Sequence, residues 1–216
     1  MKTKNVLVCS CLLVISSLAP SAFADDGSWY LGADLGRASY SGLQDIGGPF
    51  FHYYHTVDTP FIGSNTDHDT AYRLTGGYQI DQYFAVEAGY LDLGQAEIKG
   101  TVHVAPELSL ERPVDDKLKT HGFVADAVGR WPIADGWSVY GRAGEFLSRV
   151  TFDQGNPSSS TTASGGKFTY GVGVVWTPSG PIGLKLGWDR FANLGDTGST
   201  GQFSVNLLSV GVVYSF

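Results

Sequence analysis

The last nine residues, 208–216, alternate between two kinds of side chain. Large apolar side chains occupy every second position and end on an aromatic residue: Leu208, Val210, Val212, Tyr214 and Phe216. The positions between them are small or polar, except for Val213. Because successive side chains of a strand point to opposite faces, the segment has one apolar face and one polar face. A soluble strand can show this alternation. With the terminal aromatic it is typical of the closing strand of a transmembrane β-barrel, where it would serve as the C-terminal assembly signal.

The first 24 residues have the features of a secretory signal peptide. Two lysines precede an apolar stretch over 6–18, and small residues follow, ending in Ala-Phe-Ala at 22–24. A positive start, a short apolar core and a small-residue cleavage site are typical of export signals. The apolar stretch is too short to span a bilayer as a helix. We therefore expect cleavage after Ala24, which would remove both cysteines and leave no disulfide in the mature protein.

The composition of the remainder favours strands with a lipid-facing side. Charged residues make up 16% of the chain and aromatic residues 13%, and 29 of the 216 residues are glycine. Loss of the signal peptide would change the formal net charge from −7 to −9, which argues against a nucleic-acid partner. No second apolar run is long enough for a membrane helix. The length fits one domain, so we expect a signal peptide over 1–24 and a barrel domain over 25–216.

Period-two alternation predicts eight antiparallel strands in an all-β, up-and-down transmembrane barrel. The predicted strands cover 29–39, 71–78, 84–93, 123–131, 137–148, 168–176, 182–188 and 205–216. Their connections alternate between tight turns at 79–82, 132–136 and 177–181 and long loops at 41–70, 94–120, 149–166 and 190–203. Short turns at one rim and long loops at the other indicate an outer-membrane barrel.

Aromatic residues gather near the short turns, as at a membrane interface. They are Trp29, Tyr83, Trp131, Trp137, Trp176 and Phe216. A soluble sandwich or lipocalin-like barrel would also explain the strands, with its apolar faces pointing inward. It would explain neither the terminal aromatic nor the charges on the opposite strand face. We therefore expect a bacterial outer-membrane location, reached through the periplasm, with membrane lipids and the barrel assembly machinery as partners.

The face opposite the apolar one carries ionisable residues separated by glycines. These candidate lumen residues are Asp34, Arg73, Glu87, Asp126, Arg130, Arg142, Lys185 and Asp189. Six of them, all but Arg130 and Asp189, fall at similar heights and comprise three acids and three bases. An eight-stranded lumen is about wide enough to be filled by side chains, and mixed charges can compensate one another there. The pattern predicts an ion-paired plug rather than an open pore.

One carboxylate does not fit this division. If Arg142 faces the lumen, Glu145 faces lipid, where a charge is costly. Either Glu145 lies near the outer interface, or a β-bulge after Gly144 shifts the register. The sequence leaves both alternatives open.

Several ordered motifs resemble those of the OmpA-type outer-membrane barrel domain over essentially the whole mature chain. They read WYLGADLG at 29–36, GGYQ at 76–79, EAGYLDLG at 87–94, WPIAD at 131–135 and VYGRAG at 139–144, followed by the terminal strand. The resemblance implies an envelope-stabilising protein with adhesive or other surface contacts, and in some members a weak channel. The peptidoglycan-binding domain that often follows such a barrel is not indicated by this sequence.

The resemblance also implies a salt-bridge network in the lumen. Its matching positions here are Asp34, Glu87, Gly173 and Lys185. Asp34 is an acid where the family pattern has a base, and Gly173 stands where the pattern has an acid. These departures put any inherited gating in doubt, and Arg73 is a candidate for the missing positive charge.

Neither catalysis nor metal binding is indicated by the histidines. Some small outer-membrane barrels are lipid A-modifying enzymes or surface proteases, but all five histidines here fall in loops or at the upper end of a strand. A His-x-x-His pair (His52 and His55) near Asp58, His68 and Asp69 is a weak metal signal. We expect no enzyme activity, cofactor or metal. The expected function is structural, with surface contacts through the long loops, and the alternative is a narrow porin-like channel.

Overall fold

The computed structural model describes residues 27–43, 61–105, 110–154, 160–197 and 200–216, which are almost entirely β-strand. No helix within these ranges is long and apolar enough to cross a membrane. The expected signal peptide, the site at which it would be cleaved and most of the loop predicted at 41–70 lie outside the described residues. The limits of the mature domain therefore stay a prediction.

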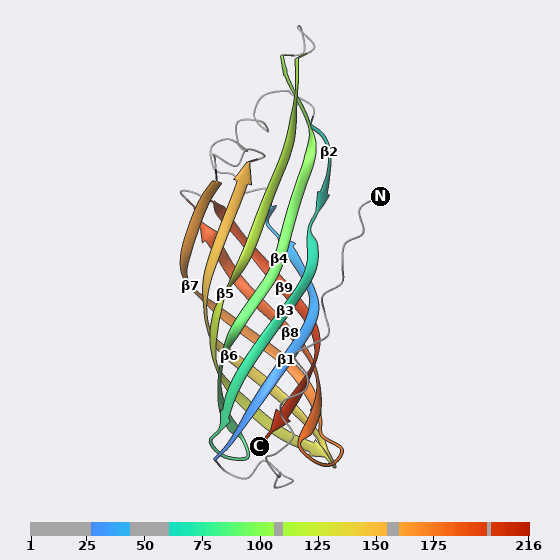
Figure 1. The fold of residues 1–216 in the computed structure, drawn as a ribbon, viewed down its shortest axis with the longest axis vertical. Helices are drawn as coiled ribbons and strands as arrows, with labels where there is room; N and C mark the ends of the chain where they lie inside the picture. Colours follow the sequence, from blue (N-terminus) through green and yellow to red (C-terminus); the bar gives the residue numbers. More distant parts are fainter. Residues whose placement is uncertain (1–26, 44–60, 106–109, 155–159, 198–199) are drawn as a thin grey trace, which may run out of the picture.

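Eight long strands form the wall of a closed barrel (Figure 1). They are β1 (Ser28–Ser41), β3 (His68–Gln79), β4 (Phe84–Ala105), β5 (Leu110–Ala134), β6 (Trp137–Gln154), β7 (Ser160–Trp176), β8 (Ile182–Asp196) and β9 (Gly201–Ser215). Sequential strands pair antiparallel around the wall, and β1 pairs with β9. The short strand β2 (Phe61–Thr66) is added to the upper part of β4. The predicted eight-stranded antiparallel barrel is confirmed.

The strands are longer than predicted, and most of the added residues lie on the long-loop side. The prediction of a loop at 94–120 is wrong, because β4 and β5 continue as a hairpin up to the pair Ala105–Leu110. Much of 149–166 and 190–203 is also strand, as are 61–66 and 68–70 of the loop predicted at 41–70. The hairpin rises above the rest of the barrel, with β2 along its β4 side (Figure 1). At the other rim, tight turns join β3 to β4, β5 to β6 and β7 to β8 as predicted, but β5 continues to Ala134 and shortens the turn predicted at 132–136.

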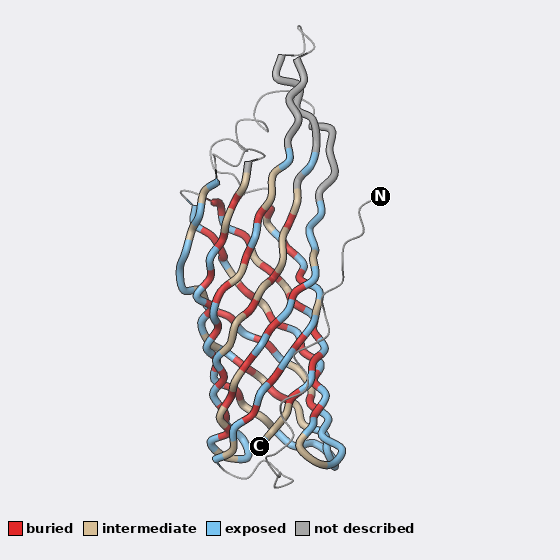
Figure 2. The backbone as a smooth tube through the Cα atoms, in the orientation of Figure 1, coloured by how far each residue is buried: buried red, intermediate tan, exposed pale blue. Residues whose placement is uncertain are grey.

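The lower part of the wall has the polarity of a membrane barrel. Outward side chains such as Leu35, Val172 and Val210 are 56–60% exposed, whereas most of their inward neighbours are buried. In this lower part, exposed and buried residues alternate along the wall strands, as Figure 2 shows. All six members of the predicted aromatic belt near the short turns are exposed. Two of them, Trp137 and Trp176, stack with ring centroids 5.9 Å apart.

The polarity of both wall faces inverts towards the upper rim. Along β9, the outward residues change from Val210 and Leu208 to Asn206 and Ser204. The inward residues change over the same stretch from Gly211 and Ser209 to Leu207, Val205 and Phe203, all three of which are at most 2% exposed. An apolar outer face suits lipid, and a polar outer face over an apolar interior suits water. The upper part of the barrel is therefore built like a soluble one.

The upper interior is an apolar core. Buried side chains from nearly every wall strand meet there, and Phe146 and Phe191 pack edge to face with centroids 5.2 Å apart. Other members of this upper core include Leu91, Leu93, Leu118, Val150 and Leu194. The sequence interpretation described the inner face by its charged and small residues alone and missed this layer. Burial of these inward apolar residues explains why the strands continue through segments predicted as loops.

A second aromatic belt marks the height at which the polarity inverts. On the outer face, the Tyr90 ring lies 5.6 Å from Phe123 and 6.3 Å from Tyr72. On the outer face of β7 and β8, the ring centroids of Tyr170 and Trp188 lie 6.1 Å apart. Aromatic residues concentrate at both interfaces of a membrane barrel, so this belt indicates the outer edge of the apolar band.

The inversion predicts where the outer membrane surface lies on β1. Leu35 and Ser39 both face outward, about 13 Å apart along the strand. In intact cells, a membrane-impermeant maleimide should label the Ser39→Cys variant much faster than Leu35→Cys, because only Ser39 lies above the apolar band. Described residues contain no cysteine that would interfere. Equal labelling of the two variants would contradict this membrane boundary.

Candidate functional site in the barrel lumen

The charged residues predicted to line the lumen lie on inward-facing positions of six different strands. Seven are buried at 9% exposure or less: Asp34, Arg73, Glu87, Asp126, Arg142, Lys185 and Asp189. The eighth, Arg130, is half-buried on β5 near the short-turn end and forms no ion pair with any residue that the structure describes. The seven buried residues, here called the charged belt, lie beneath the upper core.

Arg142 of β6 forms the most extensively bonded pair of the belt. Its guanidinium donates Nε–H to Asp189 Oδ1 at 2.5 Å, and Nη2 bonds the other carboxylate oxygen. The two parallel bonds match the planar fork of arginine to a carboxylate. The Nη1 atom lies 3.7 Å from Glu87 Oε2, and the guanidinium carbon lies 5.6 Å from the centroid of the Tyr140 ring. Arg142 therefore joins β6 to β4 and β8 across the lumen.

Arg73 of β3 is the second bridging cation. Its Nη2 donates to Asp126 Oδ2, and its Nη1 lies 3.8 Å from Asp189 Oδ2. Asp189 thus lies between two arginines and connects them. The sequence interpretation assigned Asp189 to the lumen but not to the six residues at similar heights. The length of the arginine side chains explains this difference, because Arg73 and Arg142 can contact an acid that lies at another height along the barrel axis.

Lys185 and Asp34 form a separate pair. Lys185 Nζ lies 2.9 Å from Asp34 Oδ2, and both side chains are buried. Arg73 was the candidate for the positive charge missing from the family pattern, but its contacts are with Asp126 and Asp189. Glu87 also accepts a hydrogen bond from the hydroxyl of Tyr30 at 2.9 Å. The belt therefore has four acids and three bases, with every carboxylate in contact with at least one cation.

Inward glycines make room for these side chains. A Cβ atom on Gly171 would collide with the Asp189 carboxylate, and one on Gly144 or Gly211 would collide with Asp126 or Asp34. In each case the glycine is the register partner of the acid on a neighbouring strand. At Gly173, where the family pattern has an acid, the ring of Tyr140 occupies the space. The glycines that lie between the charged residues in the sequence therefore leave the space that the buried carboxylates occupy.

The lipid-facing placement of Glu145 follows the parity of its strand. Pairing of β6 with β7 runs without a register shift from Trp137 to Asp153, which excludes the bulge alternative after Gly144. Glu145 is exposed, opposite Phe168 and Ala125 and one outward position below Leu147. This level borders the upper aromatic belt, so the alternative that places Glu145 near the outer interface is supported.

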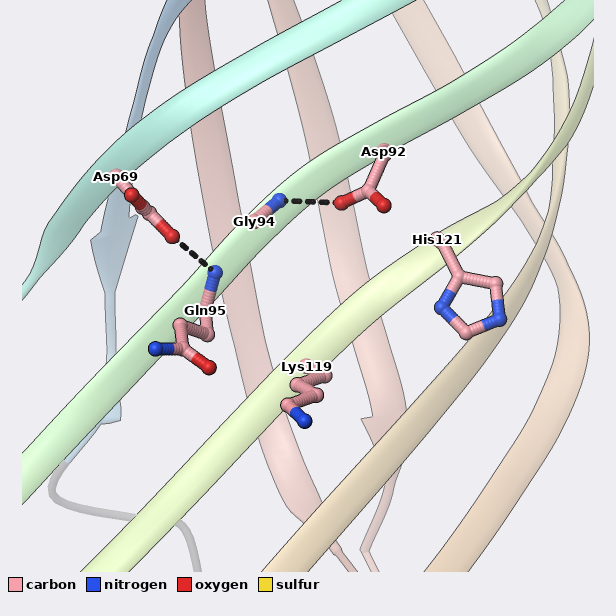
Figure 3. Close-up of a pocket in the computed structure, with 6 residues that line it drawn as sticks. All are labelled: Asp69, Asp92, Gly94, Gln95, Lys119 and His121. Carbon is pink, nitrogen blue, oxygen red and sulfur yellow. Dashed lines mark hydrogen bonds between the residues drawn. The ribbon is translucent and has the colours of Figure 1, made fainter. Parts of the chain in front are cut away.

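A pocket of about 230 Å³ lies outside the lumen, where the ladder between β3 and β4 stops (Figure 3). The last β3–β4 pair is Tyr72–Asp92, and a register shift of β4 follows before Gln95. Asp69 fills the break by accepting a hydrogen bond from the Gln95 N–H at 2.8 Å. Lys119 and His121 of β5 form the opposite wall. The sequence interpretation did not identify this pocket, because its position depends on the end of a strand pairing.

The histidines whose side chains the structure describes, His68 and His121, lie in the upper part of the barrel and outside the lumen. His68 Nδ1 lies 3.0 Å from Asp67 Oδ1, and the hydrogen bond from the imidazole lowers the pKa of the Asp67 carboxyl. Ser39 is the register partner of His68, but these two side chains do not hydrogen-bond. No group of three or more His, Cys, Asp or Glu among the described residues could hold a metal. The histidines His52 and His55 lie outside the described residues.

The closing strand pairs along its length with both neighbours. Val210, Val212 and Phe216 are exposed on the outer face, and the Phe216 N–H donates to the Trp29 carbonyl at 2.9 Å. The outward side chains of β9 thus join the apolar band formed by β8 and β1. A role of Val210, Val212, Tyr214 and Phe216 as an assembly signal stays a prediction.

The fold and the apolar outer band define an outer-membrane β-barrel, located in the bacterial outer membrane and in contact with its lipids. The family model for the OmpA-like transmembrane domain matches residues 24–216. The chain belongs to this family.

Relatives of known name agree with this assignment. Outer membrane protein A of Klebsiella pneumoniae is 28% identical over 203 residues, covering 91% of this chain and 53% of the relative. Outer membrane protein P5 of Haemophilus influenzae is 27% identical, covering 82% of this chain and 49% of the relative. The chain therefore spans about half the length of the curated relatives it matches.

Solved structures share the fold at low sequence identity. Neisserial surface protein A has a TM-score of 0.55 at 18% identity, covering 91% of this chain and all of the other. OprG of Pseudomonas aeruginosa has a TM-score of 0.51 at 13% identity, covering 89% of this chain and 97% of the other. These similarities concern the fold alone.

The contact between Asp189 and Gly171 predicts a severe effect of a larger residue at this glycine. The Gly171→Val variant should fail to form the folded, heat-modifiable band on a gel, because the side chain would displace the carboxylate that connects both arginines. Gly165→Val, on the same strand, should fold normally, because a Cβ there meets nothing within 4 Å. Normal folding of Gly171→Val would contradict the tight packing of the belt.

Proposed function

We propose that the protein is a non-enzymatic structural barrel of the outer membrane whose lumen is closed by side chains. The observation that carries this proposal is the succession of two filled layers inside one narrow barrel. The charged belt holds paired groups that are 1–9% exposed. Above it, the upper core includes Leu91, Phe146 and Phe191, each with 0% exposure. Ions crossing such a lumen would have to disrupt both an ion-pair network and an apolar layer.

The pairing in the belt supports a rigid plug rather than a wide pore. A buried charge without a partner costs several kcal/mol, and the contacts of Asp189 with both Arg73 and Arg142 compensate these charges. The Lys185–Asp34 pair lies apart from them on β8 and β1. Together the pairs connect opposite sides of the wall, which would stiffen the barrel and support an envelope-stabilising role.

Surface contacts are the second part of the proposed function. The hairpin of β4 and β5, extended by β2, projects beyond the rim and would present the chain to the surroundings of the cell (Figure 1). Binding surfaces commonly lie on segments held by a rigid scaffold. The aromatic-rich loop predicted at 41–70 would join this surface.

Catalysis is not part of the proposal. A nucleophile needs a base within hydrogen-bond reach and a third group that orients the base. Among the described residues, His68 has an orienting acid in Asp67 but no hydrogen-bonded nucleophile. That site is also open to water, since the side chains of His68 and Asp67 are 46% and 62% exposed.

Single-channel recording in planar bilayers tests the plug directly. The wild-type chain should show no sustained conductance on the nanosiemens scale, because both layers exclude a continuous water path. A variant with shortened side chains in both layers, combining Arg142→Ser and Asp189→Ser with Phe146→Ala and Phe191→Ala, should conduct more if it yields a heat-modifiable band. Sustained nanosiemens conductance of the wild type would establish the alternative, a narrow porin-like channel for small solutes.

A further inference from the structure

Three outward basic side chains lie next to one another just above the apolar band of β5 and β6. They are Lys119, His121 and Arg149, and we call them the outer cationic patch. His121 and Arg149 are direct register partners, so their Cβ atoms lie about 5 Å apart. Lys119 is the partner of Thr151, which makes it the diagonal neighbour of Arg149 at about 7–8 Å. Two long cations can thus converge on one small anion.

The level directly below the patch is strongly apolar. Phe123 and Leu147 are register partners, 64% and 56% exposed, and lie one outward position below His121 and Arg149. This spacing corresponds to about 7 Å along the strands. The Tyr90 ring lies beside Phe123 and 6.4 Å from the ring of His121. The surface therefore changes from apolar and aromatic to cationic within one step of the ladder.

Acidic residues surround the patch, but none of them forms an ion pair with its two long cations. Lys119 and Arg149 form no ion pair with any residue that the structure describes. Asp92 is the partner of His121, but its oxygens accept hydrogen bonds from the Gly94 N–H and the Tyr72 hydroxyl. Glu145 lies two outward positions below Arg149, and Asp153 lies two above it, each about 13 Å away along the strand. Asp153 on β6 and Glu97 on β4 are diagonal neighbours of Lys119, at about 7–8 Å. Neither acid forms an ion pair with Lys119, and Glu97 already contacts Lys99 and Lys117.

We propose that the outer cationic patch binds the phosphate of a phosphorylated lipid in the outer leaflet, with acyl chains against Phe123 and Leu147. Two observations select this occupant. Free cations favour a phosphate, and the patch is continuous with the lipid-facing band, so the headgroup of a lipid packed there lies level with the cations. The pocket beside Lys119 and His121, whose other wall carries Asp69 and Asp92, leaves room for the uncharged part of a headgroup (Figure 3).

Binding of a fluorescent lipid A to the full chain in neutral micelles tests this proposal. The wild type should bind phosphorylated lipid A more tightly than its dephosphorylated form. The Lys119→Gln/Arg149→Gln variant should lose about 25-fold in affinity, at about five-fold for each cation near a lipid surface. The matched control is Lys99→Gln/Lys117→Gln, which removes two cations of β4 and β5 that already contact Glu97. It should bind like the wild type.

A charge-conserving variant, a folding check and a competition with phosphate complete the test. Lys119→Arg/Arg149→Lys keeps both charges and should retain binding, which separates loss of charge from loss of structure. Each variant is first checked for a heat-modifiable band. Equal affinity for the phosphorylated and dephosphorylated lipids would overturn the proposal, as would an equal loss in the control variant. Displacement of lipid A by an equal concentration of inorganic phosphate would overturn the lipid assignment and leave a site for free phosphate.

Discussion

The pairing of charges inside a lumen enclosed by lipid is the interaction on which the rest of this structure depends. A hydrocarbon layer offers no water to ionised groups, so the charges of a membrane barrel must face inward and find partners there. Eight strands leave little space for seven buried ionisable side chains. Arg73 and Arg142 meet this constraint by sharing Asp189. Glycines such as Gly171 provide the space for these acids, because a side chain at the glycine would collide with the carboxylate beside it.

The inversion of polarity along the strands follows from the same physics. Below the upper aromatic belt, lipid surrounds the wall and the lumen holds the charges. Above it, water surrounds the wall, and the inward positions of Phe203, Val205 and Leu207 form part of an apolar core. One chain thus combines a membrane barrel and a soluble-type barrel on the same eight strands. The boundary between them positions the outer cationic patch at the height of lipid headgroups.

Much of the fold could be predicted from the sequence, because period-two alternation identifies both the strands and the face that each residue occupies. The same alternation assigned Glu145 to the lipid side, and the continuous register of β6 supports that assignment. The contacts of the lumen were less accessible. Heights estimated from residue counts left Asp189 out of the central belt, since they ignore strand tilt and the length of arginine side chains.

The upper half of the barrel escaped prediction for a different reason. In segments such as 149–153, polar residues face outward and apolar residues face inward, the reverse of the membrane pattern. A search for apolar outer faces therefore interprets these residues as loops. The pocket at the end of the β3–β4 ladder depends on a strand break that no local sequence pattern marks. The apolar upper core, unlike the pocket, becomes predictable once the change of solvent along each strand is taken into account.

A double-mutant cycle on Arg142 and Asp189 tests the central claim most directly, with unfolding free energies measured by urea titration in micelles. Arg142→Met and Asp189→Asn should each cost about 3–5 kcal/mol, because each leaves buried charge uncompensated. The double variant should cost about 1–3 kcal/mol less than the sum of the single variants, since both partners are removed together. Additive costs, within about 0.5 kcal/mol, would show that the two side chains do not stabilise each other and would contradict the account.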